Sequence, residues 1–158
     1  MDFAMIESAS RWLASTPNRT FVLYPVGVIL FEWLTRGRVG VEWWGAILLV
    51  WGYLQYRLVG GWRVASGGGG PGLDTPPERL VTSGPYRFSR NPMYLGHLVF
   101  MLGLAITFQS FVAVVILLAN GYWFNKRVEF DEKRLIARFG ADYTSYMGRV
   151  NRWAPFIG

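Results

Sequence analysis

The polar side chains that could do chemistry gather at the two ends of one long apolar stretch. Residues 78–96 supply carboxylate, guanidinium, hydroxyl and amide groups before it and at its start, and Arg127, Asp131 and Glu132 follow it. Carboxylates pair with ammonium groups or accept protons, and guanidinium groups pair with carboxylates or phosphates. If the apolar stretch folds back on itself, these groups meet at one membrane boundary and form a pocket for a polar cofactor and an amphiphilic acceptor.

The apolar stretch, residues 91–125, contains no formally charged side chain and is predicted to form a tight helical hairpin. As one helix it would measure roughly 50 Å at ~1.5 Å per residue. That length exceeds a bilayer core of ~30 Å. Two complete spans and a loop would need more residues than the stretch provides. We expect the turn near Thr107–Ser110, close to the membrane because it carries no charge.

Two further membrane spans are predicted before the hairpin. Thr20–Thr35 is apolar apart from Glu32 near its end. Val41–Trp62 carries charges only at Glu42 and Arg57, near its two ends. Charged side chains at such positions can reach the headgroup region. The predicted fold class is therefore an all-α integral membrane protein with about four transmembrane helices, the last two forming the hairpin.

The domain organisation expected from these segments is a single membrane domain over residues 1–158. Residues 126–149 alternate charged and apolar side chains at helical spacing, which predicts a cytoplasmic amphipathic helix continuing the last span. Gly140 is expected to weaken or end that helix. The predicted parts are N-terminal helices with two spans (1–62), a cytoplasmic loop rich in glycine and proline (63–90), and the hairpin with the C-terminal helix that forms the site (91–158).

Composition favours the membrane class and excludes several kinds of site. Hydrophobic residues make up 52% of the chain, aromatic residues 17%, and there are eight tryptophans. The net charge of +6 suggests nucleic-acid binding as one hypothesis. The basic residues flank apolar runs, however, so contact with membrane lipid explains them better. We expect no nucleic-acid partner. The absence of cysteine excludes thiolate chemistry, and a single histidine predicts no metal site.

The placement of basic residues also predicts an orientation. They lie before the first span, throughout the 63–90 loop, and after the hairpin at Lys126 and Arg127. With four crossings these segments share one side, which the positive-inside rule assigns to the cytoplasm. Arg36 and Arg38 are exceptions. We therefore expect both termini and the site on the cytoplasmic side of a membrane, with a prokaryotic inner membrane as the expected location.

The combined motif over residues 77–156 resembles one family. It reads Gly84-x-Tyr86-x-x-x-Arg90-x-Pro92-x-Tyr94-x-Gly96, then the hairpin, then Asp131-Glu132-x-x-Leu135-x-x-x-Phe139-Gly140-x-x-Tyr143-x-x-Tyr146. This pattern is similar to the isoprenylcysteine carboxyl methyltransferase and phospholipid methyltransferase superfamily. The resemblance implies a membrane enzyme that transfers a methyl group from S-adenosylmethionine to a lipid-like acceptor. That acceptor would be a phospholipid amine or an isoprenylcysteine-type carboxylate.

The resemblance also implies roles for individual residues. Catalytic roles fall on Arg90, Arg127 and Glu132, with Arg127 facing the acceptor. Asp131, with Glu132 beside it, would meet the ammonium group of the cofactor. The remaining cofactor-binding roles fall on Glu78, Arg79, Leu80 and Val81, through backbone groups, and on Tyr86, Asn91, Pro92, Met93 and Tyr94.

The chain departs from the family pattern at three positions. Asn91 stands where a histidine usually precedes the proline, and an amide cannot titrate, so no proton transfer is assigned there. Asp131 replaces the first glutamate of a pair, which shortens its reach by one methylene. Glu78 stands where carboxyl methyltransferases often carry a histidine, which weakens the expectation of that acceptor.

Several alternatives stay open at the level of sequence. A general base is needed only for an ammonium acceptor, and Glu132, Asp131, Tyr94 or a water could serve. Arg127 and Asp131 could simply form a solvated ion pair. His97 could be a packed residue hydrogen-bonded within the bundle or a pocket residue. The rival functions are an NADPH-dependent sterol-type membrane reductase and a small membrane scaffold or transporter subunit.

Overall fold

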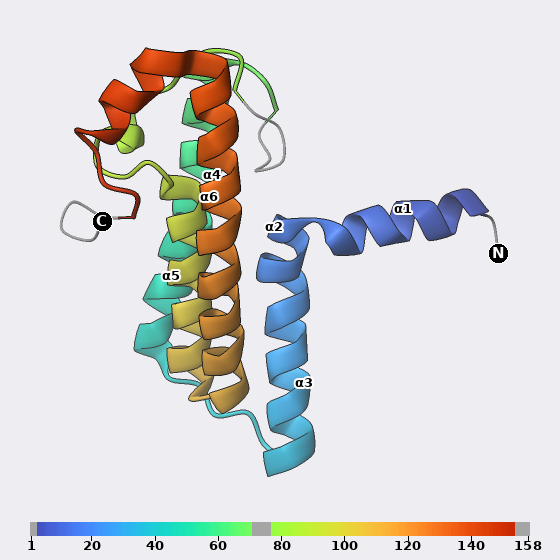
Figure 1. Cartoon of the computed structure of the whole chain (residues 1–158). Coiled ribbons are helices and arrows are strands. Elements are labelled where there is room, and N and C mark those ends of the chain that lie inside the picture. The colour runs from blue at the N-terminus through green and yellow to red at the C-terminus, as the bar shows by residue number, and fades with distance from the viewer. Residues whose placement is uncertain (1–2, 71–76, 154–158) are drawn as a thin grey trace.

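The computed structural model describes residues 3–70 and 77–153, and over these ranges the protein is all-helical, as predicted (Figure 1). In the described part of the chain, no single helix has both the length and the apolar character needed to cross a membrane. Short π-helical and 3₁₀ turns cover Arg19–Leu23, Trp43–Gly45 and Gly84–Arg87. The helices are α1 (Phe3–Ala14), α2 (Thr16–Asn18), α3 (Tyr24–Arg36), α4 (Ala46–Gly67), α5 (Pro92–Phe108) and α6 (Phe111–Met147).

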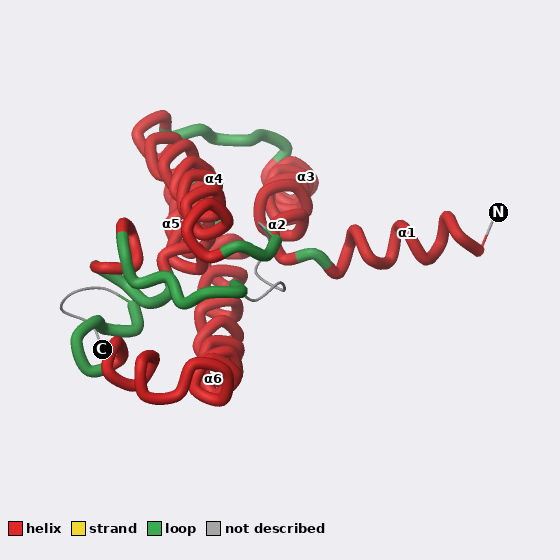
Figure 2. The backbone as a smooth tube through the Cα atoms, turned by 90° about the horizontal axis from the view of Figure 1, so that it is seen from above, coloured by secondary structure: helices red, strands yellow, loops and turns green. Residues whose placement is uncertain are grey.

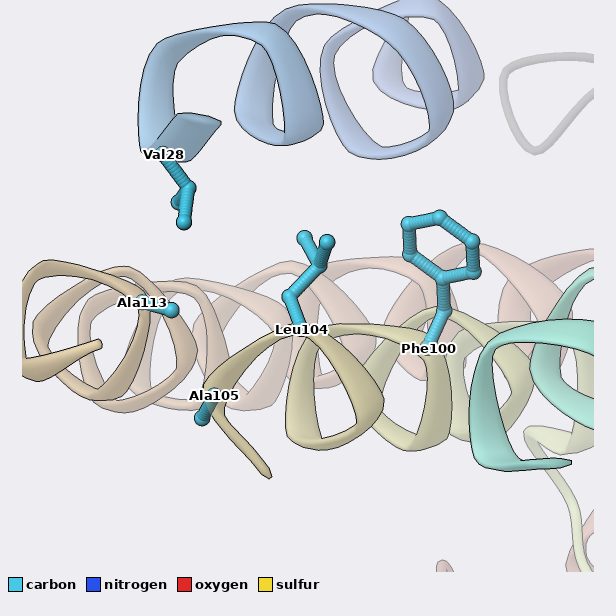
Figure 3. Close-up of a cluster of buried hydrophobic side chains, with 5 residues drawn as sticks. All are labelled: Val28, Phe100, Leu104, Ala105 and Ala113. Atoms are coloured by element: carbon cyan, nitrogen blue, oxygen red, sulfur yellow. The ribbon is translucent and has the colours of Figure 1, made fainter. Parts of the chain in front are cut away.

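Helices α3 to α6 run side by side as a bundle, and α1 projects away from it (Figure 1, Figure 2). Buried side chains from α3, α5 and α6 form one apolar core at the hairpin end, shown in Figure 3: Val28, Phe100, Leu104, Ala105 and Ala113. A second buried cluster continues it along α5 and α6: Tyr94, Met101, Phe124 and Val128. The two clusters fix the hairpin as a unit, because apolar burial is the main stabilising term in folding.

The predicted hairpin turn is confirmed. Helix α5 ends at Phe108, and Gln109 takes a left-handed conformation with φ of 46°. Ser110 then begins α6 as its N-cap, and its hydroxyl oxygen accepts a hydrogen bond from the Ala113 N–H at 3.3 Å. Ser110 is 1% exposed, so this cap satisfies a backbone donor that water does not reach.

Helices α4 and α5 approach each other through glycines. A Cβ atom on Gly52 would lie 2.5 Å from the backbone nitrogen of Phe100, and one on Gly103 would lie 2.8 Å from that of Leu49. The backbones are therefore too close to admit even an alanine without moving apart. This close packing sets where the end of α4 lies relative to the start of α5.

The loop after α4 begins later than predicted. The helix continues to Gly67 instead of ending at Trp62, and Gly68 and Gly69 follow with φ of 72° and 73°. The Gly67 carbonyl accepts hydrogen bonds from the N–H groups of Glu78 and Arg79 at 2.8 and 2.9 Å. The glycine run therefore ends the helix with a backbone of positive φ, which glycine adopts without strain.

Helix α6 bends at Gly140, where φ is 54° and ψ is −125°. The predicted amphipathic helix is present, and it does continue the second helix of the hairpin. Beyond the bend the chain crosses the end of the bundle and returns beside the start of α5 (Figure 1). A glycine is needed here because other residues rarely adopt this backbone conformation.

We expect Gly52→Ala to lower the melting temperature measured by circular dichroism in detergent. The added methyl group meets the backbone of α5, and overpacking of this kind typically costs about 1–3 kcal/mol. Gly61→Ala is the matched control on the same helix, because nothing lies within 4 Å of its added Cβ. The control should be neutral or more stable by roughly 0.5–1 kcal/mol. Equal melting temperatures for the two variants would contradict the close packing of α4 and α5.

Candidate functional site

A cavity of about 170 Å³ lies at the end of the bundle where α6 bends. Its wall is built by the end of α4, the loop at residues 77–91, the first turn of α5, and α6 on both sides of Gly140. The structure thus brings together segments that lie far apart in the sequence. Eight of the residues singled out from the sequence line this cavity: Leu80, Val81, Tyr86, Arg90, Asn91, Met93, Tyr94 and Asp131.

Three other predicted cofactor residues lie elsewhere. Glu78 and Arg79 are exposed, and their N–H groups are already bonded to Gly67, so they anchor the loop instead of lining the cavity. Pro92 occupies the first turn of α5, where the missing N–H is tolerated. Its carbonyl accepts a hydrogen bond from Nε2 of Gln55 at 3.0 Å. These three residues belong to the segments that form the cavity wall but do not line the cavity themselves.

The Asp131 carboxylate is held in place by two neighbours. Its Oδ2 atom accepts a hydrogen bond from the Tyr94 hydroxyl at 3.0 Å and lies 3.4 Å from Nε of Arg127. The ion pair that the spacing of Arg127 and Asp131 suggested is therefore present. Asp131 lines the cavity, whereas Arg127 does not line it. Arg127 therefore contacts a residue of the cavity wall without being part of that wall.

Glu132 points away from the cavity into a buried ion-pair network. Its side chain is 6% exposed, and its two oxygens lie 3.0 Å from Arg90 and 2.7 Å from Arg152. Arg152 extends the network to Asn125 at 3.3 Å and to Glu129 at 3.8 Å. The carboxylate thus pairs with two guanidinium groups and does not line the cavity. The expectation that Glu132 takes part in proton transfer at the cavity does not fit this position.

The C-terminal segment is hydrogen-bonded to the residues just before α5. The Arg90 N–H donates to the Asn151 carbonyl at 3.0 Å, and an Arg90 guanidinium N–H donates to the Met147 carbonyl at 3.1 Å. Ser89 and Asn91 donate from their side chains to the Arg152 carbonyl at 3.2 and 3.1 Å. The Asn91 amide is therefore hydrogen-bonded to the C-terminal segment, and Asn91 also lines the cavity.

Besides Tyr94, three tyrosines line the cavity: Tyr86, Tyr143 and Tyr146. The Tyr146 hydroxyl donates to the Tyr86 carbonyl at 2.7 Å, and the rings of Tyr143 and Tyr146 lie 5.8 Å apart. Burial raises the pKa of Tyr86 to about 12, opposed by nearby Arg63, and burial together with Glu132 raises the pKa of Tyr143 to about 12. Burial also raises the pKa of Tyr146. These phenols therefore stay protonated at neutral pH, which leaves the Tyr146 hydroxyl able to donate its hydrogen bond to the Tyr86 carbonyl.

The cavity wall also includes residues to which the sequence reasoning gave no site role. Arg134, Leu135 and Arg138 follow Asp131 by three, four and seven positions, so helical spacing alone could have placed them on its face. Arg63 and Pro77 had no such signal, because their positions depend on how the loop after α4 folds. The other lining residues outside the predicted site are Tyr143 and Tyr146, which the bend at Gly140 brings over the cavity.

His97 is a packed residue and does not line the cavity. It is 0% exposed, and its ring lies 4.8 Å from Phe21, 4.7 Å from Tyr56 and 5.8 Å from Phe124. Neither ring nitrogen has a hydrogen-bond partner within the part of the chain that the structure describes. The expected hydrogen bond within the bundle is therefore absent there, and aromatic packing surrounds the imidazole instead.

Part of this chain is similar in sequence to known proteins. The family model described as phospholipid methyltransferase matches residues 71–141. The protein-S-isoprenylcysteine O-methyltransferase of Saccharomyces cerevisiae is 34% identical over 79 residues, 49% of this chain and 33% of the relative. The corresponding enzyme of Mus musculus is 37% identical over 79 residues, 49% of this chain and 28% of the relative. The match thus spans about a third of these relatives' length or less.

A solved structure resembles the whole chain. The eukaryotic intramembrane Ras methyltransferase ICMT (isoprenylcysteine carboxyl methyltransferase) covers 99% of this chain with a TM-score of 0.57 and 20% identity. The chain covers 55% of that protein. The predicted superfamily resemblance is confirmed. The family match contains the cavity-lining residues from Pro77 to Arg138, whereas Arg63, Tyr143 and Tyr146 lie outside it.

We expect Glu132→Gln to destabilise the protein by about 3 kcal/mol or more in chemical unfolding. The change removes the counter-charge of Arg90 and Arg152, and breaking one partner of a buried ion pair is strongly unfavourable. Asp142→Asn is the control, since Asp142 is exposed on the same helix and lies outside this network. The control variant should lose less than about 1 kcal/mol in the free energy of unfolding. Similar losses in the two variants would refute the special role of the Glu132 network.

Proposed function

We propose that the chain is an S-adenosylmethionine-dependent methyltransferase acting on a lipid or lipid-like acceptor at a membrane surface. The observation that carries the proposal is the cavity, which gathers eight of the site residues predicted from the sequence, from both sides of the hairpin. The named relatives, all isoprenylcysteine O-methyltransferases, support the same reaction type.

The chemistry of the cavity wall fits S-adenosylmethionine. Asp131 supplies a carboxylate for an ammonium group, and Leu80, Val81 and Met93 supply apolar surface for a flat purine ring. The ring of Tyr94 offers a π-face of the kind that attracts cations such as a sulfonium. Polar donors and apolar surface thus occur together, as expected for a site that binds a polar cofactor in a partly apolar pocket.

The residues of this chain would contribute mainly by positioning. The cofactor, when bound, supplies a methyl group already activated on a sulfonium, so holding two reactants in line lowers most of the remaining barrier. Tyr94 and Arg127 fix the Asp131 carboxylate. Glu132 fixes Arg90 at the cavity wall. We therefore propose positioning roles for Arg127 and Glu132, in place of the acceptor contact and the base expected from the sequence.

The proposed membrane contact rests on exposed apolar side chains. On α3, Val26, Leu30 and Leu34 are 59%, 50% and 67% exposed at intervals of four residues. Helices α4 and α6 carry similar rows, among them Ile47 and Leu58 on α4 and Phe111, Leu118 and Tyr122 on α6. Apolar surface of this extent is typical of proteins that contact lipid or a partner. The cytoplasmic orientation and the prokaryotic inner membrane stay predictions.

The proposed acceptor is an isoprenylcysteine-type carboxylate, with a phospholipid amine as the second choice. The names of the relatives favour the first. A carboxylate is ionised at neutral pH and attacks without a general base. This agrees with a site in which Glu132 is committed to ion pairs and the buried tyrosines stay protonated.

The first test of this function is calorimetric titration of detergent-purified protein with S-adenosylhomocysteine. We expect wild-type protein to bind and Asp131→Asn to bind roughly 10- to 100-fold more weakly, because a charge-assisted hydrogen bond is lost. Asp142→Asn is the control, since Asp142 is exposed on the same helix and does not line the cavity. It should bind like the wild type.

The same titration is repeated with NADPH, the cofactor of the rival reductase. Binding of NADPH without binding of S-adenosylhomocysteine, by protein that melts cooperatively, would overturn the methyltransferase proposal. If S-adenosylhomocysteine binds, transfer of a labelled methyl group to extracted membrane lipids separates the two acceptor classes. The methyl ester of a carboxylate is hydrolysed by alkali, and the methylated amine is not.

A further inference from the structure

The cavity wall carries more positive charge than the proposed cofactor requires. Among the described residues, its charged side chains are Arg63, Arg90, Arg134, Arg138 and Asp131, so that arginines outnumber the single carboxylate four to one. S-adenosylmethionine is itself a net cation at neutral pH, since its sulfonium and ammonium groups outweigh its carboxylate. The cofactor therefore leaves the excess positive charge of the wall unbalanced.

Two of these arginines are already engaged inside the protein. Arg90 pairs with Glu132 at 3.0 Å. Arg63 donates to the Gly70 carbonyl at 2.6 Å and is 7% exposed. Both are therefore held by internal contacts, and their charges serve first to fix the wall.

Arg134 and Arg138 differ from the other two. Neither forms an ion pair or hydrogen bond with any side chain or carbonyl that the structure describes. Each guanidinium lies instead over an aromatic ring of its own helix, Arg134 at 5.7 Å from the Phe130 ring and Arg138 at 5.5 Å from the Phe139 ring. Both side chains are exposed at the rim of the cavity.

The spacing of these arginines suits one anionic group. They are four residues apart on α6, one and two turns beyond Asp131, and both line the cavity. Like charges at this spacing repel each other, so the pair is unfavourable until an anion lies between them. Guanidinium groups bind carboxylates and phosphates through paired hydrogen bonds, which makes arginine the residue suited to such recognition.

We propose that Arg134 and Arg138 bind the anionic group of the methyl acceptor, a carboxylate or phosphate attached to a lipid chain, and so select anionic acceptors. The proposal rests on the proposed function, since it places the cofactor in the same cavity. Phe130, 57% exposed and in contact with the Arg134 guanidinium, provides apolar surface beside the arginines for the lipid chain. Methyl donor and acceptor would then meet on the face of α6 that carries Asp131, Arg134 and Arg138.

The test compares Arg134→Gln/Arg138→Gln with Lys133→Gln/Arg149→Gln, which removes the same charge from exposed positions outside the cavity. Equilibrium binding is measured for N-acetyl-S-farnesylcysteine, which carries a carboxylate, and for its uncharged carboxamide, with and without S-adenosylhomocysteine. We expect the first variant to lose roughly tenfold or more in affinity for the carboxylate only. Its affinity for S-adenosylhomocysteine should stay within about twofold of wild type.

A parallel loss of S-adenosylhomocysteine affinity would overturn the proposal, because the arginines would then serve the cofactor. An equal loss for the carboxamide, or an equal loss in the control, would overturn it as well. Failure of wild-type protein to bind S-adenosylhomocysteine would refute the proposed function, while the probe without cofactor still decides the role of the arginines. The KM for phosphatidylethanolamine in nanodiscs is measured for the same variants. If this KM rises in Arg134→Gln/Arg138→Gln while the affinity for N-acetyl-S-farnesylcysteine is unchanged, the anionic group that the arginines bind is a phosphate.

Discussion

The buried carboxylate of Glu132 is the constraint on which the site depends. It joins α6 to Arg90, which precedes α5, and to Arg152 in the C-terminal segment. Backbone and side-chain hydrogen bonds between residues 89–91 and 147–152 reinforce this connection. A buried charge of this kind is tolerated only when it is fully paired, so the three segments must come together to satisfy it. Their meeting encloses the cavity.

The bundle places those segments within reach of one another. Glycines let the backbones of α4 and α5 approach closely, which sets the end of α4 beside the start of α5. The capped turn at Gln109 and Ser110 returns the chain, so that α6 runs back along α5 to the same end. The bend at Gly140 then carries Tyr143 and Tyr146 over the cavity. Packing along the bundle and the turn between α5 and α6 thus position the residues that line the cavity at the opposite end of α5.

The cavity is chemically divided between neighbouring residues of one helix. Asp131 faces the cavity and Glu132 faces the buried network, because successive residues of an α-helix point in directions about 100° apart. Arg134 and Arg138 return to the cavity face at helical spacing. One helix therefore supplies a carboxylate suited to a cationic cofactor and guanidinium groups suited to an anionic acceptor. The combination is consistent with a methyl donor and a lipid-like acceptor that bind side by side.

The sequence by itself determined the local features: the all-helical class, the turn after Phe108, the amphipathic start of the last charged segment, the ion pair of Arg127 with Asp131, and the superfamily motif. These follow from hydrophobic periodicity, absence of charge and fixed spacing along one helix, which are properties of neighbours in the chain. Only the tertiary structure decided that Glu132 is buried beneath the cavity, that Glu78 and Arg79 anchor a loop on Gly67, and that Arg63 reaches the wall. The physical reason is that each of these groups takes its partner from a distant segment, and such pairings depend on how the whole bundle packs.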